Sequence, residues 1–320
     1  MGLLKRILIT GIAGFIGSHL ARKLHDLGDY VVGCDNFNFY YDPALKMERA
    51  CLLSEQKIEV ITADICDEKA LEQLVIDHKI THLVHLAAQA GVRYSINHPE
   101  KYQETNLNGF FHVLEVLRRH PQIKFTFASS SSVYGLNKKI PFSETDQTDS
   151  PANFYGATKK CNELMAFAYH QIYGIKATGL RFFTVYGPMG RPDMAYFSFA
   201  KAIHEGQPIK LFNHGNMHRD FTYVDDIVDG IIAAVELESP FEIFNLGNNN
   251  PEELMKMIQI IESFLGKKAI VEKLPMQPGE IQITYADISK AQKHLHFHPK
   301  TSLETGMEHF LEWFVGYLGI

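Results

Sequence analysis

Tyr155 and Lys159 form a Tyr-x-x-x-Lys pair, and Ser130 lies 25 residues before the tyrosine. On an α-helix, residues four apart differ by about 40° around the axis, so the phenol and the ammonium project from one face. A nearby cation favours phenolate and lowers the pKa of tyrosine from its ordinary value of about 10. The pair therefore predicts oxidoreductive chemistry on a hydroxyl, although the same spacing also occurs on helices without a catalytic role.

A glycine-rich stretch near the start of the chain predicts a nucleotide site. Gly11-x-x-Gly14-x-x-Gly17 stands between an apolar run at 5–10 and a segment of helical periodicity at 15–27. This order of strand, loop and helix lets a diphosphate rest on the helix N-terminus, with glycines permitting close backbone approach. The spacing differs from G-x-G-x-x-G, and a glycine triplet by itself is also typical of an ordinary loop.

An acidic residue after the second apolar run indicates which dinucleotide binds. Asp35 ends the run at 30–34, where a carboxylate accepts hydrogen bonds from a ribose diol and repels a 2′-phosphate. NAD is therefore favoured over NADP. Asp64 follows the third run and suits the adenine edge, although it is also a candidate helix N-cap. The predicted cofactor contacts are Gly11, Gly14, Phe15, Ile16, Gly17, Asp35, Asn36, Asp64, Ile65, Leu86, Ala87, Ala88, Tyr155 and Lys159.

The elements that must position these residues alternate between strand and helix. Strands are predicted at 5–10, 30–34, 58–62, 83–86, 125–128 and 177–183, and helices at 15–27, 68–78, 102–119 and 155–173. This spacing predicts an α/β fold with a Rossmann-like, doubly wound parallel sheet. From residue 186 the pattern loosens into Gly, Pro and charged turns. We expect an NAD-binding domain at 1–180, which also receives a helix at 224–237, and a smaller C-terminal substrate-binding lobe at 181–320.

Composition and charge narrow the classes of partner. The chain has 320 residues and a formal net charge of −6, without a basic stripe, which argues against nucleic acid. The apolar run near the start is too short to span a bilayer and lacks the pattern of a signal peptide, so we expect no membrane contact and a cytoplasmic location. The four cysteines have no C-x-x-C spacing, and the alternating histidines at 294–298 have no accompanying carboxylate motif, so we expect no metal.

Several motifs in order, covering nearly the whole chain, resemble the extended short-chain dehydrogenase/reductase family and, within it, the nucleotide-sugar 4-epimerases. They are TGIAGFIGSHL, LAAQAGVR, ASSSSVYG, YGATK, LRFFTVYGP and RDFTYVDDI. Three segments are most similar to UDP-glucuronate 4-epimerases, namely NFNFYYDPALK, AGVRYS and RFFTVYGPMGRPDM.

The resemblance implies a definite reaction. Tyr155 as phenolate would take the proton from O4 of a UDP-sugar while the C4 hydride passes to NAD. Ser130 would hydrogen-bond the same oxygen, and Lys159 would hold the nicotinamide ribose and lower the tyrosine pKa. The 4-keto sugar would then turn and receive the hydride on its other face. The implied activity is an isomerase, with UDP-glucuronate and UDP-galacturonate as the expected pair.

Alternatives within the family differ at the positions after Ser130. Family dehydratases carry an acidic pair where this chain has Ser131 and Ser132, and family decarboxylases carry a glutamate at the position of Ser132. This chain therefore lacks the catalytic carboxylate that a dehydratase or a decarboxylase of the family would need. A 4-epimerase of neutral or N-acetylated UDP-hexoses stays open, as does a non-enzymatic NAD-binding regulator, although a regulator has no need for the full set of three catalytic residues.

A uronate substrate creates a hazard, because oxidation at C4 puts a ketone β to the carboxylate and such acids lose CO2 readily. We expect donors at Ser131, Ser132 and Thr184 to hold that carboxylate away from the reactive alignment, although a serine run is also typical of a strand end.

The further substrate contacts that the resemblance implies are Arg93, Arg191, Arg219 and Glu280. Gln277 stands where galactose 4-epimerases have an arginine, and Glu280 where relatives often have aspartate. A homodimer through the helices at 102–119 and 155–173 is also implied.

Overall fold

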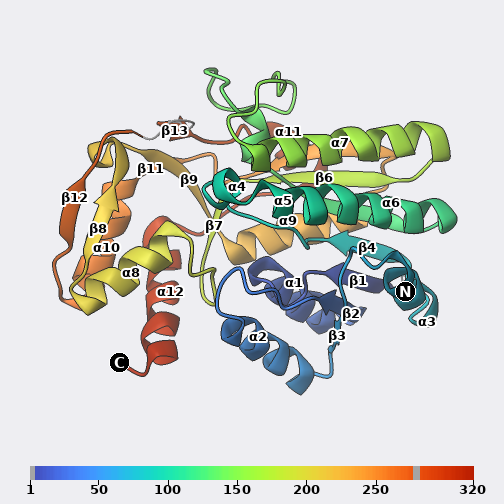
Figure 1. Cartoon of the computed structure of the whole chain (residues 1–320), viewed down its shortest axis with the longest axis horizontal. Helices are drawn as coiled ribbons and strands as arrows, with labels where there is room; N and C mark the ends of the chain where they lie inside the picture. Colours follow the sequence, from blue (N-terminus) through green and yellow to red (C-terminus); the bar gives the residue numbers. More distant parts are fainter. Residues whose placement is uncertain (1–3, 277–281) are drawn as a thin grey trace.

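A seven-stranded sheet forms the centre of the protein (Figure 1). The structure is a computed structural model that describes residues 4–276 and 282–320. Its strands follow the order β10-β6-β5-β4-β1-β2-β3, and every neighbouring pair is parallel. They are β1 Arg6–Thr10, β2 Tyr30–Asp35, β3 Glu59–Thr62, β4 His82–His85, β5 Lys124–Ser130, β6 Ala177–Phe182 and β10 Phe241–Leu246. The predicted doubly wound parallel sheet is confirmed.

Helices cover both faces of this sheet, as the alternation along β1 requires. Side chains of successive strand residues point to opposite faces. Ile7 and Ile9 belong to one apolar core, and Leu8 belongs to the other. The first face carries α1 Phe15–Asp26, α2 Ala44–Glu55, α9 Val224–Glu236 and α11 Ser289–Leu295. The second carries α3 Glu68–Asp77, α4 Tyr94–Asn97, α5 Pro99–Tyr102, the π-helix η1 Gln103–Gly109, α6 Phe110–Arg119 and α7 Phe154–Tyr173.

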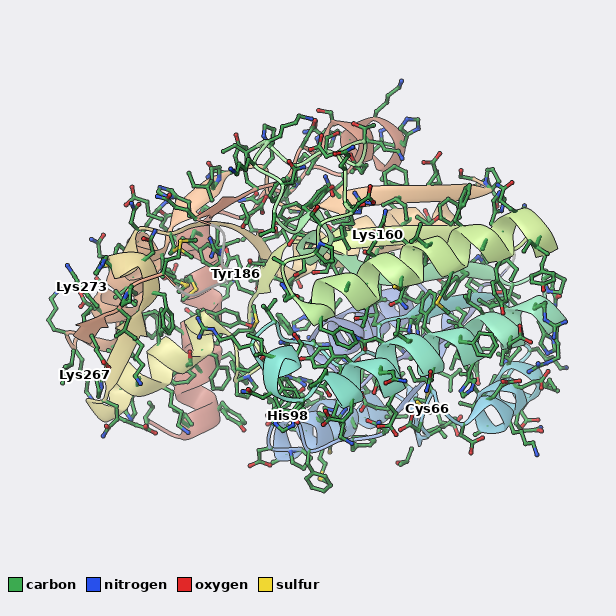
Figure 2. All side chains as sticks on the ribbon, turned by 45° about the horizontal axis from the view of Figure 1, so that its top comes forward. Cys66, His98, Lys160, Tyr186, Lys267 and Lys273 are labelled. Carbon is green, nitrogen blue, oxygen red and sulfur yellow. The ribbon has the colours of Figure 1, made fainter. Side chains whose placement is uncertain are left out.

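A second lobe stands beside one end of the sheet, at the left of Figure 1. Its strands are β7 Thr184–Tyr186, β8 Pro208–Leu211, β9 His218–Tyr223, β11 Pro251–Glu253, β12 Ile270–Lys273 and β13 Ile283–Thr284. Its helices are α8 Ala195–Glu205, α10 Leu254–Leu265 and α12 Leu303–Leu318. The described residues also form two short 3-10 helices, η2 Ser131–Tyr134 after β5 and η3 Phe212–Gly215 after β8. Tyr186 lies where the sheet meets this lobe, and its hydroxyl donates to the Ser302 carbonyl at 3.0 Å (Figure 2).

The structure contains elements around the sheet that the sequence does not predict, among them α2, α11 and β10. Helix α2 was not expected, and neither was β10, the strand that extends the sheet at its β6 edge. β10 carries Glu242 and Asn245 among its apolar residues, which obscures the strand pattern. Asn245 is nevertheless buried, because its amide donates to the carbonyls of Phe142 and Asp287. The division of the chain near residue 180 stays a prediction.

The helix expected at 102–119 is also more complex than predicted. α5, the π-helix η1 and α6 follow one another from residue 99 to residue 119. The wider turn places Asn106 in the protein interior, where its side chain bonds the backbone N–H and the carbonyl of Gln89. π-Turns within helices are frequent at functional sites. Among the described helices, none has the length and apolar character needed to cross a membrane.

Candidate active site

One cavity collects most of the predicted site residues at the carboxyl ends of the parallel strands. It lies beside β1 and β4, where the strand order reverses direction, which is the place where open α/β sheets bind ligands. Fifteen of the predicted residues line it, namely Gly11, Gly14, Phe15, Ile16, Gly17, Asp35, Asn36, Ile65, Leu86, Ala87, Ala88, Ser130, Tyr155, Lys159 and Arg191.

The glycine-rich loop forms a close backbone cradle at one end of this cavity. Gly11 has a φ of +76°, and a Cβ atom at Gly17 would lie 2.2 Å from the Gly11 carbonyl oxygen. In the described structure, no side chain caps α1 at Gly14, and its first turn holds no acidic residue. The helix N-terminus therefore presents partial positive charge and unused N–H donors to the cavity, which fits the diphosphate of a dinucleotide.

Asp35 is the last residue of β2 and stands where a ribose diol is expected. Its Oδ1 atom accepts a hydrogen bond of 2.9 Å from the backbone N–H of Phe37. The Nζ of Lys46 lies 3.5 Å from the same oxygen, and Lys46 also lines the cavity. Asn36 donates to the Asp64 carboxylate at 2.8 Å, which places Asp64 behind Asn36 rather than on the cavity wall. These residues fit the adenosine half of NAD.

Tyr155 and Lys159 extend from the first turns of α7 toward the end of β5. Asn153 caps this helix by accepting from the Gly156 N–H at 2.8 Å. Lys159 is buried, and its Nζ donates to the Ala128 carbonyl at 2.8 Å. Because burial disfavours the ammonium, the Lys159 pKa falls to about 8.

The expected lowering of the Tyr155 pKa is wrong for the chain by itself. Burial raises the pKa of this phenol, while a hydrogen bond with the Ser130 hydroxyl and the charge of Arg191 act to lower it. The nearby cation that favours phenolate is therefore Arg191, a contribution that the helical spacing of Tyr155 and Lys159 did not reveal. The Ser130 hydroxyl also accepts from the Ser132 N–H at 3.1 Å, which fixes its position at the end of β5.

Arg191 is held at the cavity by an acidic and a phenolic partner. Its Nε and Nη2 atoms donate to the Asp193 carboxylate at 3.0 and 2.6 Å. The Tyr40 hydroxyl donates to the same carboxylate at 2.9 Å. This chain of contacts joins the segment after β2 to the segment after β7. It presents a cation beside Tyr155 in the region where a charged substrate is expected.

Of the predicted substrate residues that the structure describes, only Arg191 and Ser130 line this cavity. Ser131 and Ser132 belong to η2 immediately after Ser130, and Thr184 begins β7. Arg93 lies with its guanidinium 4.5 Å from the ring centre of Phe212 in the second lobe. Arg219 donates to the carbonyls of His218 and Gln282. Glu280 and Gln277 lie outside the described residues.

Comparison with known proteins identifies the family. Residues 7–247 match the NAD dependent epimerase/dehydratase family. The chain belongs to this family.

Two kinds of family member are especially similar to this chain. UDP-glucuronate 4-epimerase 3 of Arabidopsis thaliana is 47% identical over 97% of this chain and 76% of the relative. The crystal structure of the Bacillus cereus UDP-glucuronic acid 4-epimerase with UDP-glucuronic acid and NAD superposes with a TM-score of 0.91 at 36% identity, covering 97% and 99% of the two chains. The Thermus thermophilus UDP-glucose 4-epimerase with NAD gives 0.87 at 28% identity, again covering 97% and 99%.

The cavity of the present protein is also lined by residues that the sequence analysis did not assign to the site. The segment after β2 supplies four of them, Asn38, Tyr40, Tyr41 and Lys46, and the other side supplies Gln89, Thr105, Val185 and Met194 among others. The first four lie within NFNFYYDPALK, a stretch whose resemblance to UDP-glucuronate 4-epimerases was noted. That resemblance was the available signal, because neither hydropathy nor spacing distinguishes these residues from a surface loop.

Proposed function

We propose that this protein catalyses NAD-dependent 4-epimerisation of a UDP-sugar, interconverting UDP-glucuronate and UDP-galacturonate. One observation carries the proposal: Ser130, Tyr155 and Lys159 line the same cavity as the glycine-rich loop, and serines rather than carboxylates follow Ser130. The similarity to UDP-glucuronate 4-epimerases over nearly the whole chain supports it.

Each catalytic side chain has a separate task in this reaction. Bound NAD would supply the acceptor, and afterwards the donor, for the C4 hydride, held by the glycine-rich loop and Asp35. Tyr155 takes the O4 proton as the hydride leaves and gives it back in the second half of the cycle. Ser130, which hydrogen-bonds Tyr155, orients the sugar hydroxyl toward the phenol. Lys159 remains an ammonium below pH 8 and supplies donors for ribose hydroxyls.

Arg191 makes this proton transfer easier. Its charge lowers the pKa of the buried Tyr155 phenol, and so stabilises the phenolate that must act as a base. The bond network from Asp193 and Tyr40 keeps the guanidinium in place during this step. We propose that Arg191 also binds an anionic group of the substrate, since the guanidinium fork suits carboxylate and phosphate oxygens.

The keto intermediate must keep its carboxylate. Among residues 131–134, which directly follow Ser130, there is no acid that would assist loss of water or CO2. We assign Ser131, Ser132 and Thr184 to hold the substrate carboxylate out of line with the carbonyl π system. Arg93 and Arg219, together with Glu280, are assigned to the nucleotide diphosphate and ribose.

Product analysis tests this function. Purified protein is incubated separately with UDP-glucuronate and UDP-glucose, with and without added NAD, and the products are identified by NMR. We expect UDP-galacturonate from the first substrate. The similarity to the Thermus UDP-glucose 4-epimerase makes neutral UDP-hexoses the second candidate, and turnover of UDP-glucose alone would establish it instead. UDP-xylose or a 4-keto-6-deoxy product would overturn the epimerase proposal.

We also propose a homodimer through α6 and α7. The two helices lie side by side on one face of the sheet (Figure 1). Large apolar side chains on them are exposed, with exposed fractions of 43–69%. They are Phe111, Leu164, Phe167, Ile172 and Tyr173. Exposed large apolar groups on two neighbouring helices favour a protein interface, and we propose a second copy of the chain as the partner. A cytoplasmic location stays a prediction.

A further inference from the structure

Three consecutive backbone carbonyls after β7 are held by side chains from the first half of the chain. The Nε2 of His19 donates to the Pro188 carbonyl at 3.0 Å, since a carbonyl oxygen can only accept. The Arg49 guanidinium donates to the carbonyls of Met189 and Gly190. His19 belongs to α1 and Arg49 to α2, drawn in blue in the lower part of Figure 1.

Arg49 uses its complete donor set in this contact. Its side chain is fully buried. Nε and Nη2 reach the Met189 oxygen at 3.1 and 2.6 Å, and Nη2 also reaches the Gly190 oxygen at 3.3 Å. Nη1 donates to the Ala13 carbonyl at 3.1 Å and to the Tyr41 hydroxyl at 2.8 Å. These five contacts match the five N–H donors of a guanidinium.

The charge of Arg49 has no acidic partner. Across residues 4–276 and 282–320, no carboxylate forms an ion pair with it, so its compensation comes from carbonyl and hydroxyl dipoles. A buried charge is costly unless all its donors are satisfied. A group that serves only packing at this position would be apolar. The guanidinium instead joins two particular segments of backbone, at Ala13 and at Met189 and Gly190.

Those segments are the two sides of the proposed active site. Ala13 lies in the glycine-rich loop between Gly11 and Gly14, which line the cofactor end of the cavity. Met189 and Gly190 directly precede Arg191, which lines the same cavity beside Tyr155. Met189 has a φ of +56°, a left-handed conformation that a residue with a side chain adopts only where its surroundings enforce it. Two bonds from Arg49 to the Met189 carbonyl provide that enforcement.

We propose that Arg49 is a positioning residue that couples the cofactor loop to the substrate segment 188–191, so that NAD and the UDP-sugar each tighten the binding of the other. The inference rests on the proposed function in that it takes these two ligands as occupants of the cavity. Fixing the segment for one ligand fixes it for the second, because both binding surfaces are attached to the same guanidinium. Such coupling is reciprocal, and its usual size is about 5–150-fold in affinity.

Arg49→Lys is the sharpest variant. Lysine keeps the charge but has three donors on one nitrogen, so it cannot span Ala13, Met189 and Gly190 together. Arg6→Lys is the matched control, because the Arg6 guanidinium also donates to a backbone carbonyl and lies 3.9 Å from a tyrosine ring centre, that of Tyr30. Arg6 does not line the cavity.

The experiment measures NAD affinity of the stripped protein by calorimetry, with and without saturating UDP. In the unaltered protein and in Arg6→Lys, we expect UDP to tighten NAD binding about tenfold. In Arg49→Lys this factor falls to below about twofold, and the KM for UDP-glucuronate rises about tenfold while kcat changes less than threefold. A residue that acts only on stability would lower Tm and leave the coupling factor unchanged, and that result would overturn the proposal.

His19→Leu gives a second test if Arg49→Lys does not fold. It removes the donor to Pro188, together with the contacts of His19 Nδ1 with Arg22 and Asp225 on the other side of the ring. Partial loss of the coupling factor supports the proposal, and retention of the full factor contradicts it. The outcome is separate from that of the proposed function. A chain that binds NAD and UDP cooperatively but makes no UDP-galacturonate would refute the assigned reaction and support the role of Arg49.

Discussion

The ammonium of Lys159 donates a 2.8 Å hydrogen bond to the carbonyl oxygen of Ala128, two residues before Ser130. This bond ties the catalytic face of α7 to the end of β5. The described residues place no carboxylate at ion-pair distance from Lys159, so burial lowers its pKa to about 8 without a compensating charge. The protein therefore carries a buried cation at neutral pH whose presence costs stability, as expected for a group kept for function.

Replacing this lysine by methionine should make the protein more stable and inactive. The lowering of the Lys159 pKa from 10.5 to about 8 corresponds to a burial cost on the order of 3 kcal/mol. Loss of the bond to Ala128 offsets about 1 kcal/mol of the gain. We expect the free energy of unfolding of Lys159→Met to exceed that of the unaltered protein by about 2 kcal/mol at pH 7, measured with urea.

Measuring the stability difference between Lys159→Met and the unaltered protein at higher pH tests whether the buried ammonium is the cause of that difference. Because the folded-state pKa lies below the unfolded value, the unfolded chain binds more protons than the native chain between about pH 8 and 10.5. The stability cost of burying Lys159 therefore falls as pH rises through that window. The advantage of Lys159→Met should therefore shrink between pH 7 and pH 9.5. An advantage that is absent at pH 7, or that grows with pH, would show that the ammonium is not desolvated.

Tyr155→Phe should separate chemistry from binding. The substitution removes the proton acceptor, and general acid–base catalysis contributes about 10²–10⁴-fold to rate. We expect kcat to fall by about 10³-fold while the affinity for NAD, measured by calorimetry, stays within about twofold. Ser130→Ala serves as a comparison that retains the phenol and should lose less activity. Full activity in Tyr155→Phe would reject the assigned mechanism.

Asp35→Asn should relax the choice of cofactor. Asparagine keeps the oxygen that accepts the Phe37 N–H but removes the negative charge, while the Lys46 ammonium remains 3.5 Å from that oxygen. A 2′-phosphate then meets attraction instead of repulsion. We expect the preference for NAD over NADP to fall at least about tenfold, equivalent to about 1.4 kcal/mol, in paired binding titrations. Unchanged discrimination would place the ribose away from Asp35.

The serines and Thr184 should control the fate of the keto intermediate. Loss of one hydrogen bond to a charged group costs about 1.5–3 kcal/mol, which corresponds to about tenfold or more in relative rate. Ser131→Ala, Ser132→Ala and Thr184→Val are therefore expected to raise the ratio of UDP-pentose to UDP-galacturonate. Chromatography of the products measures it. An unaltered product ratio in all three variants would remove these residues from the carboxylate site.

A charge on α7 should dissociate the proposed dimer. Leu164 is 56% exposed on α7, and Leu27, 59% exposed at the end of α1, is a matched control on another helix. Burying a glutamate without a partner is strongly unfavourable. We expect Leu164→Glu to give a monomer by light scattering, whereas Leu27→Glu remains dimeric. A monomeric unaltered protein would exclude this interface.

Sequence patterns captured the sheet because its strands are short apolar runs separated by helices. β1, β2, β4 and β5 were predicted to within about two residues at either end. β10 was missed because Asn245 is polar in a strand interior, and its burial depends on partners at Phe142 and Asp287 that are remote in the chain. Local patterns do not contain such tertiary compensation.

Part of the candidate active site could likewise be predicted from the sequence, because some of its residues follow local spacing rules. The glycine-rich loop, Asp35 and the Tyr155–Lys159 pair follow local spacing rules, so their placement along the chain was predictable. Arg49 and Lys46 lie on a helix that the sequence analysis did not assign. Their importance comes from the contacts of Arg49 with Met189 and Gly190 and of Lys46 with Asp35. The direction of the Tyr155 pKa likewise depended on burial and on Arg191.

One isotope measurement tests the central claim most directly. UDP-glucuronate carrying deuterium at C4 is converted by the purified protein, and the product is analysed by NMR and mass spectrometry. Removal and return of one hydride within the site predicts UDP-galacturonate that retains deuterium at C4 with inverted configuration. Replacement of that deuterium by solvent hydrogen, or its appearance in released cofactor beside a stable keto or pentose product, would contradict the account.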